Sequence, residues 1–158
     1  MKKEDFQGEY FTLEELCRSK TLEAYNKKHP GHEIDNTPDG AALANLQTLT
    51  TMLLDPIREN WLHPIIVNSG YRCPELNKLV HGAVKSQHLI GQAADIRVDV
   101  EDPKVRRAIN RRLLGLILFL DVPFDQLIAE NCDSHGCPEW LHISYGERGR
   151  SELIIDNA

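Results

Sequence analysis

The sequence contains few cysteines and no long apolar run, and each shortage excludes a class of protein. The four cysteines, Cys17, Cys73, Cys132 and Cys137, are too few and too scattered for a disulfide scaffold, so we expect them to be reduced thiols. The longest apolar run, residues 113–120, is far shorter than the ~20 residues that a membrane-spanning helix needs. We therefore expect a protein that neither depends on disulfides nor crosses a membrane.

Positive charge is also scarce. Lysine and arginine number 18 against 24 aspartates and glutamates, which gives a formal net charge of −6. A nucleic-acid-binding protein needs a basic surface that displaces counterions from phosphates, so we expect no nucleic-acid partner. The densest basic run, residues 106–112, follows a helical pattern, and we interpret it as a solvated helix face.

The chain has 158 residues, 41% of them hydrophobic and 27% charged, which is typical of one soluble domain. Residues 1–6 include two lysines, but no apolar segment follows them, so they do not resemble a secretory signal. We therefore expect synthesis in the cytoplasm, and we expect a monomer.

Local patterns predict an α+β fold. Thr12 and Glu15 form a capping box that should open a helix reaching about Tyr25. Thr37-Pro38 is expected to begin the next helix, which Pro56 should kink or restart. A further helix is predicted over residues 103–120, and strands over residues 65–67, 94–100, 125–129, 141–145 and 153–155. Because strands cluster after the first helices, we expect a small, largely antiparallel sheet with helices packed on one side.

Two histidines and an aspartate form a candidate metal site. His88, Asp95 and His142 are side chains that suit Zn²⁺, and three protein ligands leave a fourth position open for a catalytic water. His88 and Asp95 are seven positions apart, so a straight strand would place them on opposite faces, roughly 23 Å apart. They can share a metal only if the chain turns back between them, and Gly91 supplies the freedom for that turn.

Glu139 is a candidate base, because it lies three residues before His142. On a regular strand the two side chains would point to opposite faces. Glu139 therefore reaches a metal-bound water only if Pro138 introduces a turn or a bulge. Nearby, Cys132, His135 and Cys137 lack a fourth ligand and the usual spacing, so we do not expect a second metal there.

These residues belong to a larger pattern. A Ser-x-His-x-x-Gly-x-Ala-x-Asp motif is present as Ser86, His88, Gly91, Ala93 and Asp95. A Ser-Gly-Tyr-Arg segment precedes it at residues 69–72, and Glu-Trp-Leu-His follows at residues 139–142. Together these motifs, spread over residues 36–146, resemble the zinc D-Ala-D-Ala carboxypeptidases and their relatives, the vancomycin-resistance D,D-dipeptidases, phage endolysins and the hedgehog signalling domain. The tryptophan stands one residue farther from the histidine than in the dipeptidases.

The resemblance implies a hedgehog- or DD-peptidase-like fold and a role for each motif residue. It implies that His88, Asp95 and His142 hold one Zn²⁺ per chain and that Glu139 takes a proton from the attacking water. Arg72 is then expected to stabilise the oxyanion or to bind a substrate carboxylate.

The resemblance also leaves alternatives open. Ser86 and Tyr71 are weaker candidates for substrate contacts. Glu130, at the end of a predicted strand, and His135, in the loop after it, are the alternative bases. Some relatives carry an acidic residue at the position of Glu130.

The function implied is hydrolysis of a D-amino-acid bond in a peptidoglycan stem peptide or muropeptide, as a carboxypeptidase or an endopeptidase. If a phage encodes the chain, release through a holin pore is expected, as for an endolysin. The alternatives are a non-catalytic zinc-binding domain and a phage structural or assembly protein on the same fold. The expected organisation is a single domain: an N-terminal helical extension (residues 1–35), a catalytic core (residues 36–146) and a tail or edge strand (residues 147–158).

Overall fold

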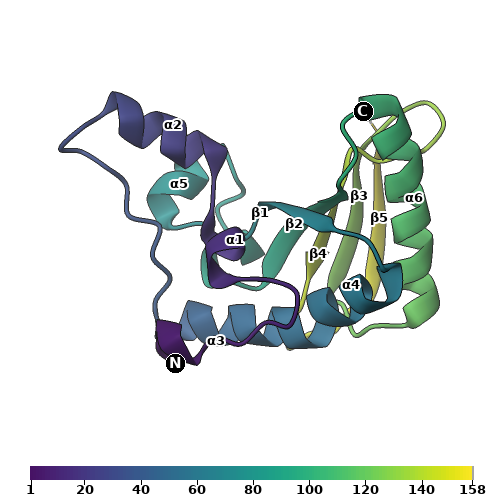
Figure 1. Ribbon diagram of the computed structural model, residues 1–158, viewed down its shortest axis with the longest axis horizontal. Helices are drawn as coiled ribbons and strands as arrows, with labels where there is room; N and C mark the ends of the chain where they lie inside the picture. The colour runs from purple at the N-terminus through teal and green to yellow at the C-terminus, as the bar shows by residue number, and fades with distance from the viewer. Residues whose placement is uncertain (158) are drawn as a thin grey trace.

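The computed structural model describes residues 1–157, which form six α-helices, three short helices of other types and five strands (Figure 1). The α-helices are α1 (Leu13–Cys17), α2 (Lys20–Lys28), α3 (Gly40–Leu49), α4 (Asp55–Trp61), α5 (Pro74–Leu79) and α6 (Pro103–Leu120). The short helices are the 3-10 helices η1 (Lys3–Asp5) and η3 (Gln87–Ile90) and the π-helix η2 (Thr50–Leu54). The strands are β1 (Ile65–Ser69), β2 (Ala93–Val98), β3 (Gln126–Cys132), β4 (Trp140–Ser144) and β5 (Glu152–Asn157).

All five strands lie in one sheet, in the order β1-β2-β4-β3-β5. Each pair is antiparallel except β3 with β5, which is parallel and places the last strand at the edge. The α+β prediction with a largely antiparallel sheet is therefore confirmed. In the described part of the chain, no helix is long and apolar enough to cross a membrane.

The two faces of the sheet have different roles, because successive side chains along a strand point to opposite sides. Alternate apolar residues of β2, β3 and β4 are fully buried on one face, for example Ile96, Leu127 and Leu141. Figure 1 shows α6 lying along this sheet, and Leu113 and Ile117 of α6 join the same core. The opposite face is left for polar side chains, and it carries the candidate site.

Two helix starts differ from the sequence prediction, and both corrections come from competing caps. The helix expected to run from Thr12 to Tyr25 is divided, because the Ser19 hydroxyl accepts from Leu22 N at 3.2 Å and starts α2. Thr37 does not cap α3; Asp39 does, and its carboxylate accepts from Ala42 N at 2.8 Å. At Pro56 the expected restart is present, since that proline lies in the first turn of α4, directly after η2.

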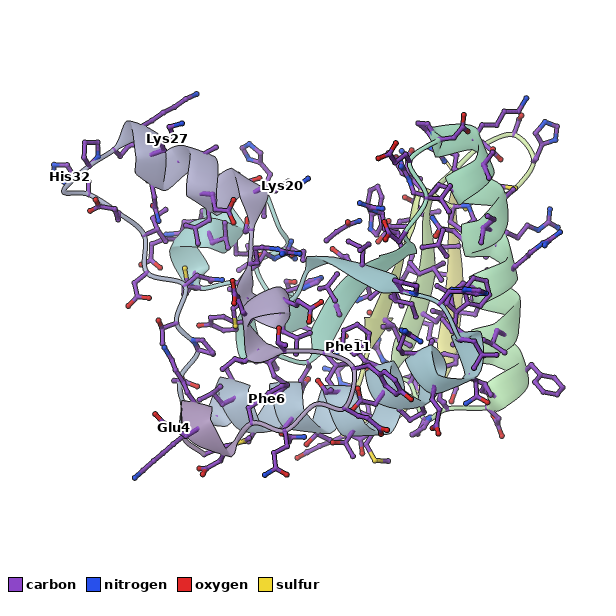
Figure 2. The ribbon with its side chains drawn as sticks, in the orientation of Figure 1. Glu4, Phe6, Phe11, Lys20, Lys27 and His32 are labelled. Atoms are coloured by element: carbon purple, nitrogen blue, oxygen red, sulfur yellow. The ribbon has the colours of Figure 1, made fainter. Side chains whose placement is uncertain are left out.

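The N-terminal segment lies against the helices that support the sheet. In Figure 2 the side chains of Phe6 and Phe11 lie near α3 and α4, and Phe11 is almost fully buried in the core. Gln7 and Gln47 exchange two hydrogen bonds, of 2.7 and 2.8 Å, which fix this segment against α3. Phe6 and Phe11 therefore pack on the same core as the sheet.

Candidate metal centre and cleft

A sharp turn brings the first two candidate ligands together. Ser86 caps η3, with its hydroxyl accepting from His88 N at 3.3 Å, and η3 ends at Gly91 with φ +74°. A Cβ at this position would lie 2.5 Å from the Ala42 carbonyl oxygen, so both the backbone angle and the space require glycine. The turn predicted at Gly91 is confirmed, and β2 begins two residues later and carries Asp95 back toward His88.

His88, Asp95 and His142 form one cluster. Asp95 and His142 are directly paired on the adjacent strands β2 and β4. One carboxylate oxygen of Asp95 lies 3.2 Å from Nε2 of His88 and 3.0 Å from Nδ1 of His142. Ligands held tetrahedrally at ~2.0–2.1 Å from a zinc ion lie roughly 3.3 Å from one another, so these spacings fit a shared metal.

The orientation of the His88 ring suits it to bind a cation. Nδ1 of His88 lies 2.7 Å from the Gly70 carbonyl, which can only accept, so Nδ1 carries the proton. Nε2 of His88 then faces the Asp95 carboxylate, 3.2 Å away, where it can donate a proton or bind a cation. A positive charge between the two atoms, either a proton or a metal ion, stabilises this arrangement. Orientation of a metal-binding imidazole by a backbone carbonyl is common at metal sites.

Asp95 is suited to this role because it remains ionised. Burial acts to raise the pKa of the Asp95 carboxyl, but the charge of His88 and the hydrogen bonds from both imidazoles act against it. The net result is a pKa below the usual aspartate value. The cluster therefore offers a negative oxygen and two imidazole nitrogens, the donor set of a zinc or similar divalent ion.

The carbonyl that orients His88 is itself fixed from the N-terminal side of the chain. The backbone of Leu16 accepts from Tyr71 N at 2.8 Å. It passes so close to Gly70 that a Cβ there would lie 2.1 Å from the Leu16 oxygen. Gly70 is thus required by close packing, which explains the glycine of the Ser-Gly-Tyr-Arg segment.

An open cleft of about 930 Å³ surrounds the cluster. Arg72 and Ser86 line one part of it, and the guanidinium donates to the Ser86 hydroxyl at 3.3 Å. Arg72 carries a buried Nε with no hydrogen-bond partner within residues 1–157. The terminal N–H groups of the guanidinium form only the one side-chain hydrogen bond to Ser86 among the described residues, so they can also donate to a ligand.

Asn36 positions Arg72, and sequence reasoning did not identify it. Its buried amide donates to the carbonyls of Cys17 and Tyr71, at 2.9 and 3.1 Å, and accepts from Cys73 N at 2.7 Å. The residues before and after Arg72 are therefore fixed by one side chain. A lone asparagine in a loop carries no recognisable sequence signal, so only the structure reveals it.

Glu139 does not reach the cleft, which corrects its placement as the base. Its carboxylate lies on the other side of the sheet and accepts from Arg107 of α6 at 3.2 Å and from Asn131. The Asn110 amide holds its carbonyl at 2.7 Å. The turn or bulge at Pro138 that Glu139 would need is not present in the required sense. The alternation of side chains along the strand therefore keeps Glu139 and His142 on opposite faces.

Glu130 occupies the position that Glu139 was expected to take. It lines the cleft and lies directly across from Trp140, so it is diagonal to His142 on the same face. Diagonal neighbours lie about 7–8 Å apart, which leaves room for a water between the carboxylate and the cluster. Burial, followed by the charge of Asp95, raises the pKa of the Glu130 carboxyl, as is typical of a general base.

Tyr71, a candidate substrate contact, and His135, an alternative base, lie outside the cleft. Tyr71 is buried in the core and does not line the cleft. His135 is exposed in the loop after β3, where its carbonyl accepts from Arg111 on α6, and it does not line the cleft. Ser86 does line the cleft, beside Arg72.

A buried aspartate secures one end of the cleft. Asp125 accepts two hydrogen bonds from the Arg150 guanidinium, both 2.9 Å, and one from Gln87 at 3.0 Å. Its backbone NH donates to Ser144 O at 2.8 Å. Because Gln87 precedes His88 and Ser144 follows His142, Asp125 links the two segments that carry histidine ligands to the C-terminal segment.

Acid should weaken this link. Hydrogen bonds from Arg150 hold the pKa of Asp125 well below its usual value, so its stabilisation is complete above the unfolded-state pKa near 4. The stabilisation is lost as the pH falls below 4 toward the folded-state pKa. Asp125→Asn should lower the free energy of unfolding at pH 7 by about 1–2 kcal/mol and flatten its decline below pH 4. Urea unfolding at pH 7 and pH 3.5 measures both.

Glu152→Gln is the matched control, because Glu152 also pairs with Arg150, at 3.2 Å, but from an exposed position. It should leave both the stability and its pH dependence unchanged. An equal loss in the two variants would show that the buried position of Asp125 has no special importance.

A polar cluster of two histidines and an aspartate in an open cleft, on the free face of an α+β sheet, is the arrangement of a metal-dependent hydrolase. The family model of Peptidase M15 matches residues 9–115, more than half of the chain, and the chain belongs to that family. It is therefore a peptidase. The match includes His88 and Asp95, whereas His142 lies beyond it and is placed in the site by the sheet pairing. No curated protein is similar enough to the chain to be reported as a relative.

Proposed function

We propose that the protein is a zinc-dependent peptidase that hydrolyses a D-amino-acid bond in peptidoglycan stem peptides. One observation carries the metal. His88 is oriented through Nδ1 by the Gly70 carbonyl, and its Nε2, one oxygen of Asp95 and a nitrogen of His142 all lie within 4.8 Å of one another in the cleft. Membership of the M15 family supports the peptidase chemistry. The Ser-Gly-Tyr-Arg motif at residues 69–72 and the Ser-x-His-x-x-Gly-x-Ala-x-Asp motif at residues 86–95 support the substrate class.

His88 Nε2, an oxygen of Asp95 and His142 Nδ1 would hold the ion, one per chain. Bound Zn²⁺ supplies a water with a pKa near 7 and polarises the scissile carbonyl. Three protein ligands with an open cleft above them leave the coordination position that this chemistry requires.

Two side chains of the cleft complete the mechanism. Glu130 accepts the proton of the attacking water and passes it to the leaving amine, a task for which a raised carboxyl pKa is suited. Arg72 faces the same space and donates to the oxyanion or to a substrate carboxylate, because its guanidinium has no carboxylate partner within residues 1–157.

The proposed substrate is a stem peptide or muropeptide. We further propose that the protein is a monomer and that it binds neither nucleic acid nor a membrane. The net charge of −6 supports the first exclusion. We propose cytoplasmic synthesis and, if a phage encodes the chain, release through a holin pore.

The test combines metal analysis with product analysis. The purified protein should contain one zinc ion per chain and should release D-alanine from a D-Ala-D-Ala peptide or cut intact peptidoglycan at a D-amino-acid bond. A chelator should stop the reaction and added Zn²⁺ should restore it. Stoichiometric zinc without turnover on either substrate would instead identify a non-catalytic zinc-binding domain.

A further inference from the structure

A second hollow adjoins the cleft, and its lining is strongly cationic. This hollow, of about 770 Å³, lies between the start of α2 and strand β1. Four cationic side chains line it, Arg18, Lys20, Arg72 and Arg97, against a single carboxylate, Glu23. The chain as a whole has a net charge of −6, so the excess of positive charge in this hollow is opposite in sign to that of the whole protein.

The positive charge of this cationic groove is not neutralised by the protein itself. None of its four cations forms an ion pair within residues 1–157. Arg97 donates only to the Asn68 amide oxygen and the Val98 carbonyl, each at 3.0 Å. Arg18 and Lys20 are exposed. The groove therefore presents uncompensated charge that an anionic ligand can satisfy.

Arg72 connects the groove to the site, because it lines both hollows. A ligand in the cleft that extends past Arg72 enters the cationic groove. The backbone there is rigid, since Leu16 O binds Tyr71 N and Asn36 binds the Cys17 carbonyl. Arg18 directly follows this fixed backbone segment, and it lines the same hollow as Arg72.

We propose that the cationic groove binds a free carboxylate on the arm of the peptide substrate that extends beyond Arg72. The inference rests on the proposed function and adds to it that the substrate is an acidic peptide. The carboxylate is bound by three cationic side chains of the groove, Arg18, Lys20 and Arg97. In a stem peptide, the α-carboxylate of the γ-linked D-glutamate is such a group, and it is removed when that residue is amidated.

The test uses two stem pentapeptides, one with the free α-carboxylate of D-glutamate and one with its amide. The protein should cleave the free acid with a kcat/KM about tenfold higher at low ionic strength. In R18Q/K20Q this preference should fall to about twofold. It should also weaken in the unchanged protein at ~0.5 M salt, where charges are screened over a few ångströms.

K27Q/K28Q is the matched control. It removes the same amount of charge from the other end of α2, whereas Arg18 and Lys20 lie just before α2 and at its first residue. Figure 2 shows Lys20 at the inner end of α2 and Lys27 toward the outer end. The control should keep the tenfold preference. If both double variants lost the preference equally, the effect would come from net charge, and the proposed binding of a carboxylate in the groove would be wrong.

Two further outcomes separate the inference from the function on which it rests. Cleavage of both peptides at equal rates by the unchanged protein would overturn the cationic groove and leave the peptidase proposal intact. Cleavage of neither peptide by the zinc-loaded protein, nor of intact peptidoglycan, would overturn the proposed function and the groove with it.

Discussion

His142→Ala should abolish the bound metal and lower kcat/KM by more than about 10³-fold. A catalytic metal supplies several kcal/mol to the transition state, and each 1.36 kcal/mol is a factor of ten in rate. Without His142, one aspartate oxygen and one imidazole remain, and two protein ligands do not hold zinc tightly. Metal content by mass spectrometry and the rate of stem-peptide cleavage measure the two effects.

His135→Ala is the matched control, because it removes a histidine from the same part of the chain. His135 is exposed and lies outside the cleft, so this variant should keep its zinc and its activity. Circular dichroism should show that both variants are folded. If folded His142→Ala retained one zinc ion per chain, His142 would not be a zinc ligand. If His135→Ala lost activity, His135 would take part in the reaction.

The fold was largely predictable from the sequence, because strong local patterns mark its main elements. The helix over residues 103–120 was predicted with the bounds of α6, and the strands were found where apolar residues alternate or cluster. The errors are two misplaced helix starts and the short helix α5, which the sequence analysis did not predict. Ser19 and Asp39 compete with other residues as caps, and tertiary packing decides which of them is used.

The metal cluster was predictable for a different reason. Its histidines and aspartate were selected by residue type. The odd spacing of His88 and Asp95 would place them on opposite faces of a straight strand, so the chain had to turn between them, and Gly91 provides that turn. The same parity argument placed Glu139 and His142 on opposite faces, and the structure follows it. The motif favoured Glu139, whose carboxylate lies outside the cleft. The register of two strands, which places Glu130 diagonal to His142, cannot be read from one sequence.

The two glutamates can be distinguished directly. Glu130→Gln should lower kcat by roughly 10²–10⁴-fold while zinc remains bound, because the side chain keeps its shape but can no longer accept a proton. Glu139→Gln should keep kcat within a few fold. It should lower the melting temperature instead, since it weakens the contacts of Glu139 with Arg107 and Asn131.

Glu139 and Glu130 are close neighbours, since Glu139 N donates to Glu130 O at 2.9 Å, so each variant is the natural control for the other. A general disturbance of this hairpin would affect both variants alike. A catalytic role for Glu130 predicts a loss of kcat in only one of them, with zinc content unchanged in both. If kcat falls with Glu139→Gln and survives Glu130→Gln, the sheet in solution must bend at Pro138 and bring Glu139 into the cleft.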